Sequence, residues 1–172
     1  MPAITVALVR GPCAGAGLAI AAACDLRIVS RSAVFTSAYL RAGLSGDFGG
    51  LPYLSRLIGH GAAARWYLLP DKVSAEEADR LGLVSILCED DTFDRTGSDT
   101  VERLATSAPP ALRAIKRNLV DYAAVPLKEY LDHEAVRHAT VRASPEVAEA
   151  AAAFAEKRAP RFAEWSGQVE AG

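Results

Sequence analysis

Two short stretches of this sequence carry residues that can do acid–base or anion-stabilising chemistry. The first is the glycine-rich turn Gly11–Gly17, which directly follows the apolar run Ile4–Val9. A strand, a tight turn and a helix in this order leave backbone N–H groups unpaired at the helix N-terminus, where the helix dipole adds positive potential. Such a turn can hold a phosphate or stabilise a developing oxyanion. The alternative is a turn whose small residues serve only close packing.

The spacing of the glycines gives a dinucleotide site little support. Counted from Gly15 and Gly17, the third position of a Gly-x-Gly-x-x-Gly fingerprint is Ile20. A ribose-binding carboxylate is expected about 20 residues further on, and the residues there, Phe35 and Thr36, are not acidic.

The second stretch is Gly43–Gly50, in which Asp47 is the only carboxylate between Asp25 and Asp71. Asp47 immediately precedes a predicted helix. A carboxylate in this place can serve as a general base. It can also be a helix N-cap, because Asp before a helix commonly accepts hydrogen bonds from backbone N–H groups.

Strands and helices that alternate along the first part of the chain must position these two stretches. Apolar runs predict strands at Ile4–Val9, Leu26–Val29, Val34–Thr36 and Leu83–Leu87. Helices are predicted at Phe48–Ile58 and Gly61–Leu69, and a third helix begins at the capping box of Ser74 and Glu77 and stops at Gly82. The alternation predicts an α/β fold for residues 1–107.

Residues 108–172 are predicted to be wholly helical. One helix is expected at Leu127–Arg142, and another begins at Ser144-Pro145. Apolar residues recur at helical spacing at Leu112, Ile115, Leu119 and Tyr122. This stripe is expected to be core or a subunit contact.

Composition and charge limit the classes of protein to which this chain can belong. The chain has 172 residues, 51% of them apolar, and a formal net charge of −2, which favours one globular domain and gives no nucleic-acid footprint. Cys13, Cys24 and Cys88 form no paired framework, which fits a reducing, cytoplasmic compartment better than a secreted one. No basic region precedes the opening apolar run, so neither a signal peptide nor a membrane span is predicted. No motif supports a metal site.

Together the two stretches resemble the enoyl-CoA hydratase/isomerase (crotonase) superfamily, and further matching motifs follow in order. They are Val73–Ala78 with Leu81–Val84, Lys116 in a helix, and Phe154–Phe162 near the end. The resemblance runs from Pro2 to about Phe162. It implies the family's ββα spiral, here incomplete at the N-terminus, followed by a C-terminal helical trimerisation region.

The resemblance implies an acyl-CoA thioester substrate, with coenzyme A as part of the substrate and no permanently bound cofactor. The family holds the thioester carbonyl between two backbone N–H groups while the α-carbon loses a proton and an enolate forms. Ala16 stands at the position of one donor, and the resemblance places the other upstream of residue 1. Loss of one such donor typically costs about a hundredfold to a thousandfold in rate. A fragment, a late start and a shortened protein are all compatible with this opening.

The carboxylates depart from the pattern of the family's hydratases. Those enzymes carry two glutamates that position and activate water, and the matching positions here are Ala19 and Tyr39. Neither side chain exchanges a proton with water near neutral pH, since tyrosine has an ordinary pKa of about 10. Ala19 and Tyr39, with Gly15 and Gly43, are instead expected to shape the substrate pocket.

The position of Asp47 is similar to that of the carboxylate in epoxyphenylacetyl-CoA and dienoyl-CoA isomerases. One carboxylate that removes a proton at one carbon and returns it at another shifts a double bond without activating water. The expected function is therefore a double-bond isomerase with Asp47 as base and Ala16 as oxyanion donor. The alternatives are a hydratase-type lyase of fatty-acid or aromatic-acid degradation and a truncated, catalytically silent homologue.

The resemblance also implies partners. The C-terminal helices of the family pack across a homotrimer, often doubled to a hexamer, and Lys157 matches a lysine that reaches coenzyme A. The alternative for Lys157 is a solvated cation near a helix C-terminus. Neither nucleic acid nor a membrane is expected as a partner.

Overall fold

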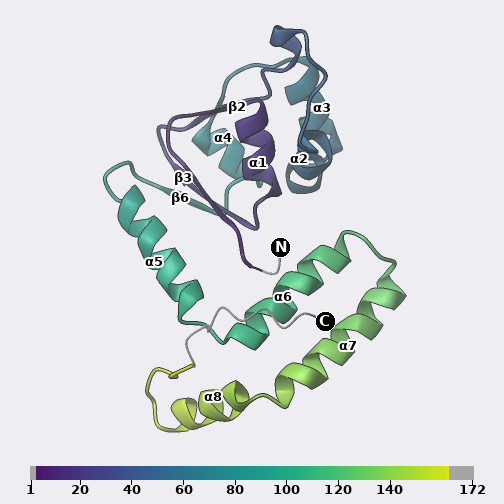
Figure 1. Ribbon diagram of the computed structural model, residues 1–172. Helices are drawn as coiled ribbons and strands as arrows, with labels where there is room; N and C mark the ends of the chain where they lie inside the picture. The colour runs from purple at the N-terminus through teal and green to yellow at the C-terminus, as the bar shows by residue number, and fades with distance from the viewer. Residues whose placement is uncertain (1–2, 163–172) are drawn as a thin grey trace. The chain divides into compact units, whose positions relative to one another are not determined.

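The computed structural model describes residues 3–162 (Figure 1). Its strands are β1 (Val6–Val9), β2 (Pro12–Ala14), β3 (Leu26–Ser30), β4 (Val34–Thr36), β5 (Val73–Ser74) and β6 (Ile86–Cys88). Its helices are α1 (Ala16–Ala23), α2 (Gly50–Ile58), α3 (His60–Leu68), α4 (Ala75–Arg80), α5 (Phe93–Ala105), α6 (Pro109–Tyr122), α7 (Leu127–Arg142) and α8 (Pro145–Ala155). A short 3-10 helix, η1, spans Leu40–Ala42. The predicted α/β class is confirmed.

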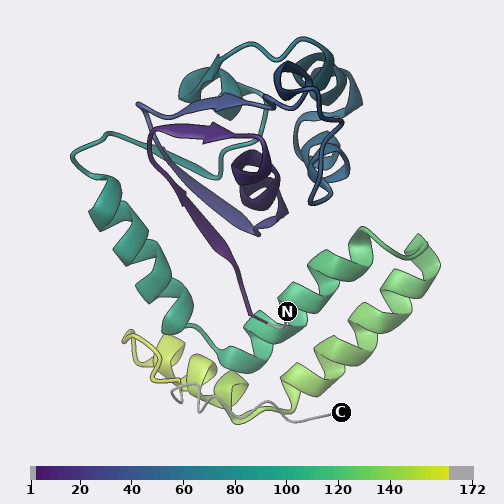
Figure 2. The ribbon, with the colours of Figure 1, turned by 45° about the horizontal axis from the view of Figure 1, so that its top comes forward.

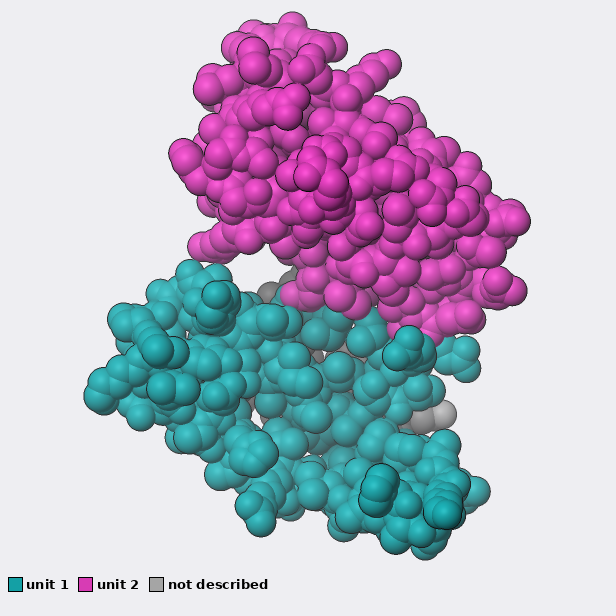
Figure 3. Space-filling view, turned by 180° about the vertical axis from the view of Figure 1, so that it is seen from behind, with its two compact units in different colours: residues 1–4, 101–172 teal, residues 5–100 magenta. Residues whose placement is uncertain are grey.

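The chain divides into two compact units, coloured in Figure 3. One unit is Thr5–Thr100, and the other joins Met1–Ile4 to Val101–Gly172, so the division falls within α5. The assignment of 1–107 as a spiral core and of 108–172 as a trimer-forming region stays a prediction. Residues 163–172 of that second region lie outside the described residues.

Two small sheets organise the unit Thr5–Thr100. One contains β1, β3 and β6, all parallel, and the other contains β2 parallel to β4, with β5 antiparallel to β4. The predicted strand Ile4–Val9 corresponds to β1; the chain then bends at Gly11 (φ 74°) and continues as β2 in the other sheet, so β2 lies within the segment predicted as a glycine-rich turn. The segment from β3 to β4 makes the same change of sheet. The change of sheet after β1 places Gly15 of the glycine-rich turn directly after β2.

Helix α1 lies between the strands and the α2–α3 pair in both ribbon views (Figures 1 and 2). Its small residues allow α2 to approach closely, since a Cβ built on Gly50 would lie 2.9 Å from the Cβ of Ala19. Apolar side chains from strands and helices of this unit pack around α1 and form a core that excludes water. Its largest fully buried members are Phe35, Leu54, Leu83 and Val29.

A buried arginine closes the C-terminal end of α1. Arg27 is 5% exposed, and its guanidinium donates hydrogen bonds to the backbone carbonyls of Leu83 at 2.6 Å and Cys24 at 2.5 Å. Weaker bonds reach the carbonyls of Ala21 and Asp25. Burial lowers the pKa of Arg27, and the charge is offset by these carbonyl dipoles. Arg27 therefore ties α1 to the segment that leads into β6.

In the helical unit, α6 packs against α7 through a charged network. Asp121 accepts one hydrogen bond from Arg137 at 2.5 Å and pairs with His133 at 2.9 Å. The predicted apolar stripe is largely exposed, with Ile115 at 51% and Tyr122 at 77%. Ile115, Leu119 and Tyr122 are therefore not core residues, Leu112 is half-buried, and contact with another subunit stays a prediction.

Several boundaries differ from the sequence expectations. Helix α2 begins at Gly50 rather than Phe48, because Phe48 (φ 49°) and Gly49 (φ 68°) adopt the left-handed conformation, which a helix does not continue through. Helix α5 and strands β2 and β5 were not predicted. Lys116, which belongs to the matching motifs of the sequence analysis, lies in α6 and is only 9% exposed. The capping role of Ser74 is confirmed, since its side chain accepts a hydrogen bond from the Glu77 N–H.

Candidate active site

The glycine turn leads directly into the N-terminus of α1. Gly15 caps α1 with φ 53° and ψ −122°, a conformation that L-residues rarely adopt, and its N–H bonds to the carbonyl of Thr36 at 3.2 Å. This bond fixes the start of α1 against β4. The N–H groups of the first helical turn, Ala16 included, have no acceptor within the helix. Ala16 therefore lies where a donor is expected, and its role as an oxyanion donor stays a prediction.

Asp47 lies in the loop between η1 and α2 and directs its carboxylate to Tyr39. The Tyr39 hydroxyl donates a hydrogen bond to Oδ1 of Asp47 at 2.5 Å. The N-cap of α2 is Gly49, and no side chain caps that helix. The helix-cap alternative for Asp47 is therefore wrong. Asp47 remains exposed, so its carboxylate is accessible to a substrate.

Tyr39 connects the carboxylate to the glycine turn. Its side chain is 6% exposed, and its ring lies beside Gly15, where an added Cβ would lie 3.9 Å from Cε1. Burial, together with the hydrogen bond and the negative charge of Asp47, raises the pKa of Tyr39 to about 12. The phenol therefore stays protonated and acts as a donor. Tyr39 thus contacts Gly15 with its ring and Asp47 with its hydroxyl group.

Tyr67 of α3 is a member of this cluster that the sequence analysis missed. Its ring stacks on Tyr39 with centroids 5.8 Å apart and planes 24° apart. Its hydroxyl and the methyl group of Ala19 both border Gly50, where a Cβ would lie 2.5 Å from the hydroxyl oxygen. Ser37 also connects the segment of Tyr39 to helix α3, because its buried hydroxyl donates a hydrogen bond to the backbone carbonyl of Trp66 at 2.7 Å. No motif or residue spacing in the sequence predicts that α3 packs against the Asp47 loop.

Backbone strain flanks both members of the hydrogen-bonded pair. Ala38, which precedes Tyr39, has φ 58°, and Phe48, which follows Asp47, has φ 49°. Non-glycine residues in this conformation cost about 1–3 kcal/mol each and persist only where the surrounding structure holds them. The fold therefore stores strain beside Asp47.

Two predicted site residues lie apart from this cluster. Gly43 ends η1 with φ 72° and is exposed, and an added Cβ there would meet no atom within 4 Å. Lys157 is exposed in the turn after α8, with φ 55°, and belongs to the helical unit. Their roles toward substrate and coenzyme A stay predictions.

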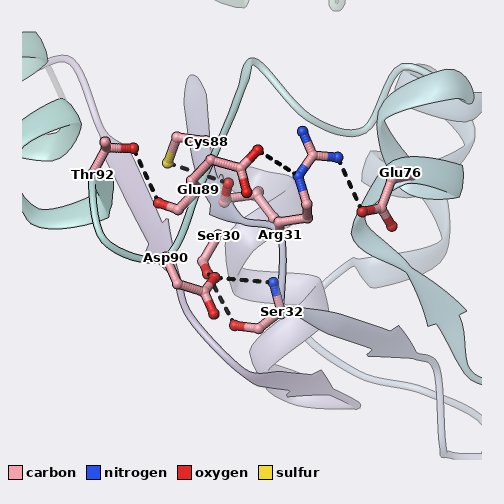
Figure 4. A network of polar contacts seen from close by, with 9 residues as sticks. Ser30, Arg31, Ser32, Glu76, Cys88, Glu89, Asp90 and Thr92 are labelled. Carbon is pink, nitrogen blue, oxygen red and sulfur yellow. Dashed lines mark hydrogen bonds and ion pairs between the residues drawn. The ribbon is translucent and has the colours of Figure 1, made fainter.

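A second polar cluster stands at the ends of β3 and β6 (Figure 4). Asp90 accepts hydrogen bonds from the Ser30 hydroxyl and from the Ser32 N–H, and Arg31 pairs with Glu89 at 2.8 Å. A surface hollow of about 520 Å³ lies there. Because the serines and Arg31 already partner these carboxylates, the cluster joins the two strand ends and is not a candidate active site.

A family model described as enoyl-CoA hydratase/isomerase matches residues 1–165. This chain belongs to the enoyl-CoA hydratase/isomerase family. Among curated relatives of the family, a probable enoyl-CoA hydratase of Rhodobacter capsulatus is 35% identical over 94% of this chain and 63% of its own length. The 1,2-epoxyphenylacetyl-CoA isomerase of Escherichia coli is 32% identical over 94% of this chain and 62% of its own length. The chain thus spans less than two thirds of these relatives.

Solved structures of the family agree. A putative enoyl-CoA hydratase from Streptomyces coelicolor A3(2) superposes with a TM-score of 0.89 and 36% identity, covering 94% of this chain and 59% of that one. The crotonase-type fold is therefore confirmed. The relatives carry both hydratase and isomerase names, so the family alone leaves the choice between these two reactions open. Among the described residues, no helix has the length and apolar character that crossing a membrane requires.

Proposed function

We propose that this chain binds an acyl-CoA thioester and acts as a double-bond isomerase, with Asp47 as its base. The observation that supports this most strongly is the exposed Asp47 carboxylate, which the Tyr39 hydroxyl orients at 2.5 Å. Tyr39 in turn lies against the turn that begins α1. Tyr39 thus lies between a base, Asp47, and the N-terminus of α1. This arrangement suits removal of a proton from the carbon next to a thioester carbonyl.

In the proposed reaction, the thioester carbonyl oxygen accepts a hydrogen bond from the Ala16 N–H. Asp47 removes a proton from the carbon between the carbonyl and the double bond, and the electron pair delocalises onto the carbonyl oxygen as a dienolate. The dipole of α1 favours that negative charge. The protonated Asp47 then returns the proton to the far carbon of the dienolate, and the double bond moves by one position. No water is consumed.

Hydration is the second candidate, supported by the hydratase name of a similar relative. It requires groups that activate water and protonate the product. The two positions at which the family's hydratases carry glutamates are Ala19, which has no ionisable group, and Tyr39, whose pKa of about 12 keeps it protonated. We therefore favour isomerisation. The proposal includes Gly15 and Gly43 in the pocket, Lys157 as a contact to coenzyme A, and assembly into trimers.

Product analysis tests the proposal. The protein is incubated with 2-enoyl- and 3-enoyl-CoA thioesters, and the products are followed by mass spectrometry and NMR. Isomerisation gives a product of unchanged mass with a shifted double bond, and Asp47→Asn should slow it by at least about a hundredfold, the usual worth of a general base. Asp71→Asn, which removes another exposed carboxylate, should leave the rate unchanged. A product heavier by one water would support hydration instead.

A further inference from the structure

Tyr67 contacts the loop of Asp47 on both sides and also contacts the hydrogen-bond partner of Asp47. Its ring stacks on Tyr39 and borders Gly46, where an added Cβ would lie 3.0 Å from Cε1 of Tyr67. Its hydroxyl borders Gly50, at the start of α2. The residue before Asp47, the helix after it and the tyrosine that binds it therefore share one neighbour.

Within the loop, backbone hydrogen bonds from the Leu44 N–H to the Tyr39 carbonyl and from the Gly50 N–H to the Asp47 carbonyl, both 2.9 Å, hold its two ends. Leu44 and Phe48 are 60% and 64% exposed, so the loop's own apolar side chains contribute little burial. Gly46 (φ 117°), Phe48 and Gly49 all lie at positive φ, a conformation that contacts from outside the loop must maintain. Tyr67, half-buried on helix α3, supplies such contacts.

We infer that Tyr67 is a positioning residue for Asp47, whose ring holds Tyr39 and the Gly46–Gly50 loop in one arrangement. The catalytic consequence of this inference rests on the proposed function, whereas the placement of Asp47 does not. Burial and the charge of Asp47 raise the pKa of Tyr67, so its neutral ring stacks on Tyr39 without adding a second charge to the site.

The first test measures the placement of Asp47 without any substrate. Tyrosines are labelled with ¹³C at the ζ carbon, and the Tyr39 signal is assigned from its loss in Tyr39→Phe. Asp47→Asn should shift the Tyr39 signal in the otherwise native protein and in Tyr67→Phe, which keeps the ring. The same substitution should leave that signal unmoved in Tyr67→Leu, because Tyr39 and Asp47 no longer meet. An equal shift in the Tyr67→Leu background would overturn the inference.

The second test measures the consequence for proton transfer. Tyr67→Leu should lower the rate of α-proton exchange by about tenfold to a hundredfold, since displacement of a catalytic group by about 1 Å has that effect, and should leave the affinity for the thioester nearly unchanged. Tyr67→Phe should restore the rate. In the Asp47→Asn background, Tyr67→Leu should cause no further loss, because Tyr67 acts through Asp47. Leu68→Ala is the control, since Leu68 is the neighbour of Tyr67 on α3 and is 67% exposed.

The two tests separate the inference from the proposed function. If the native protein exchanges no thioester proton, the proposed function fails, and the NMR comparison alone still decides whether Tyr67 places Asp47. An additive loss in the double variant, or an unchanged rate in Tyr67→Leu, contradicts the positioning role. If circular dichroism shows that Tyr67→Leu does not fold, Tyr67→Met, which fills similar space without a flat ring, takes its place with the same expected results.

Discussion

The contact between α1 and α2 predicts that Gly50→Ala destabilises the protein, although alanine is the better helix former. Gly50 is the first residue of α2 and is buried. An alanine Cβ there would lie 2.9 Å from the Cβ of Ala19 and 2.5 Å from the Tyr67 hydroxyl oxygen. The tyrosine can rotate away, but the Ala19 methyl group moves only with α1. The substitution therefore pushes the two helices apart beside the site.

Gly61 supplies a matched control for the magnitude. It lies in the first turn of α3, is exposed, and an added Cβ there would meet no atom within 4 Å. Gly61→Ala should therefore raise the free energy of unfolding by up to about 1 kcal/mol, the difference in helix propensity between glycine and alanine. Gly50→Ala gains the same increment but also overpacks the contact, which costs about 1–3 kcal/mol. The two variants should differ by that cost.

Urea unfolding at one protein concentration measures this difference, with the fluorescence of buried Trp66 and circular dichroism as probes. The double variant Ala19→Gly/Gly50→Ala should be destabilised by less than the sum of its single changes, because the methyl group that Gly50→Ala meets is absent. If Gly50→Ala is as stable as Gly61→Ala, the close approach of α1 to α2 is wrong, and so is the argument that places Tyr67 against this contact.

Two further predictions concern charged groups away from the site. Arg27→Met keeps the approximate volume but leaves the buried carbonyls of Leu83 and Cys24 without donors, so the free energy of unfolding should fall by about 2–5 kcal/mol in urea titrations; a loss below about 1 kcal/mol would contradict it. Arg158 and the Arg161 N–H lower the pKa of Glu149 from its ordinary value of 4.5 to about 2, so this carboxylate stabilises the fold fully above pH 4.5 and progressively less as the pH falls toward about 2. Glu149→Gln should remove that part of the acid dependence of the urea midpoint, and an unchanged pH profile would show that the pairing contributes nothing.

Much of the fold follows from local pattern. The strand Val34–Thr36 and the helix Leu127–Arg142 have the predicted bounds. Periodicity and capping determine these elements, because each has an unambiguous apolar pattern or a clear start. The glycine turn shows the limit of this approach. Its first part forms strand β2, which pairs with β4 in a different sheet from β1, and these partners are distant in sequence.

The site was predicted in part. Asp47 was identified because it is the only carboxylate in its stretch and because its position is similar to that of the carboxylate in related isomerases. Its closeness to Tyr39 was not foreseen, since it depends on how the loop turns back at positive φ. Tyr67 was missed because a tyrosine on an amphipathic helix looks the same whether it packs in the core or against a functional loop. Only the packing of α3 against the loop distinguishes the two cases.

The central claim is that Asp47 removes a proton from an acyl-CoA thioester. Exchange of thioester α-protons into heavy water, followed by NMR, tests it most directly, because exchange reports enolate formation whatever the final product. The account predicts exchange by the native protein and by Asp71→Asn, and its loss in Asp47→Asn. Exchange that persists unchanged in Asp47→Asn, or that is absent from the folded native protein, would contradict the account.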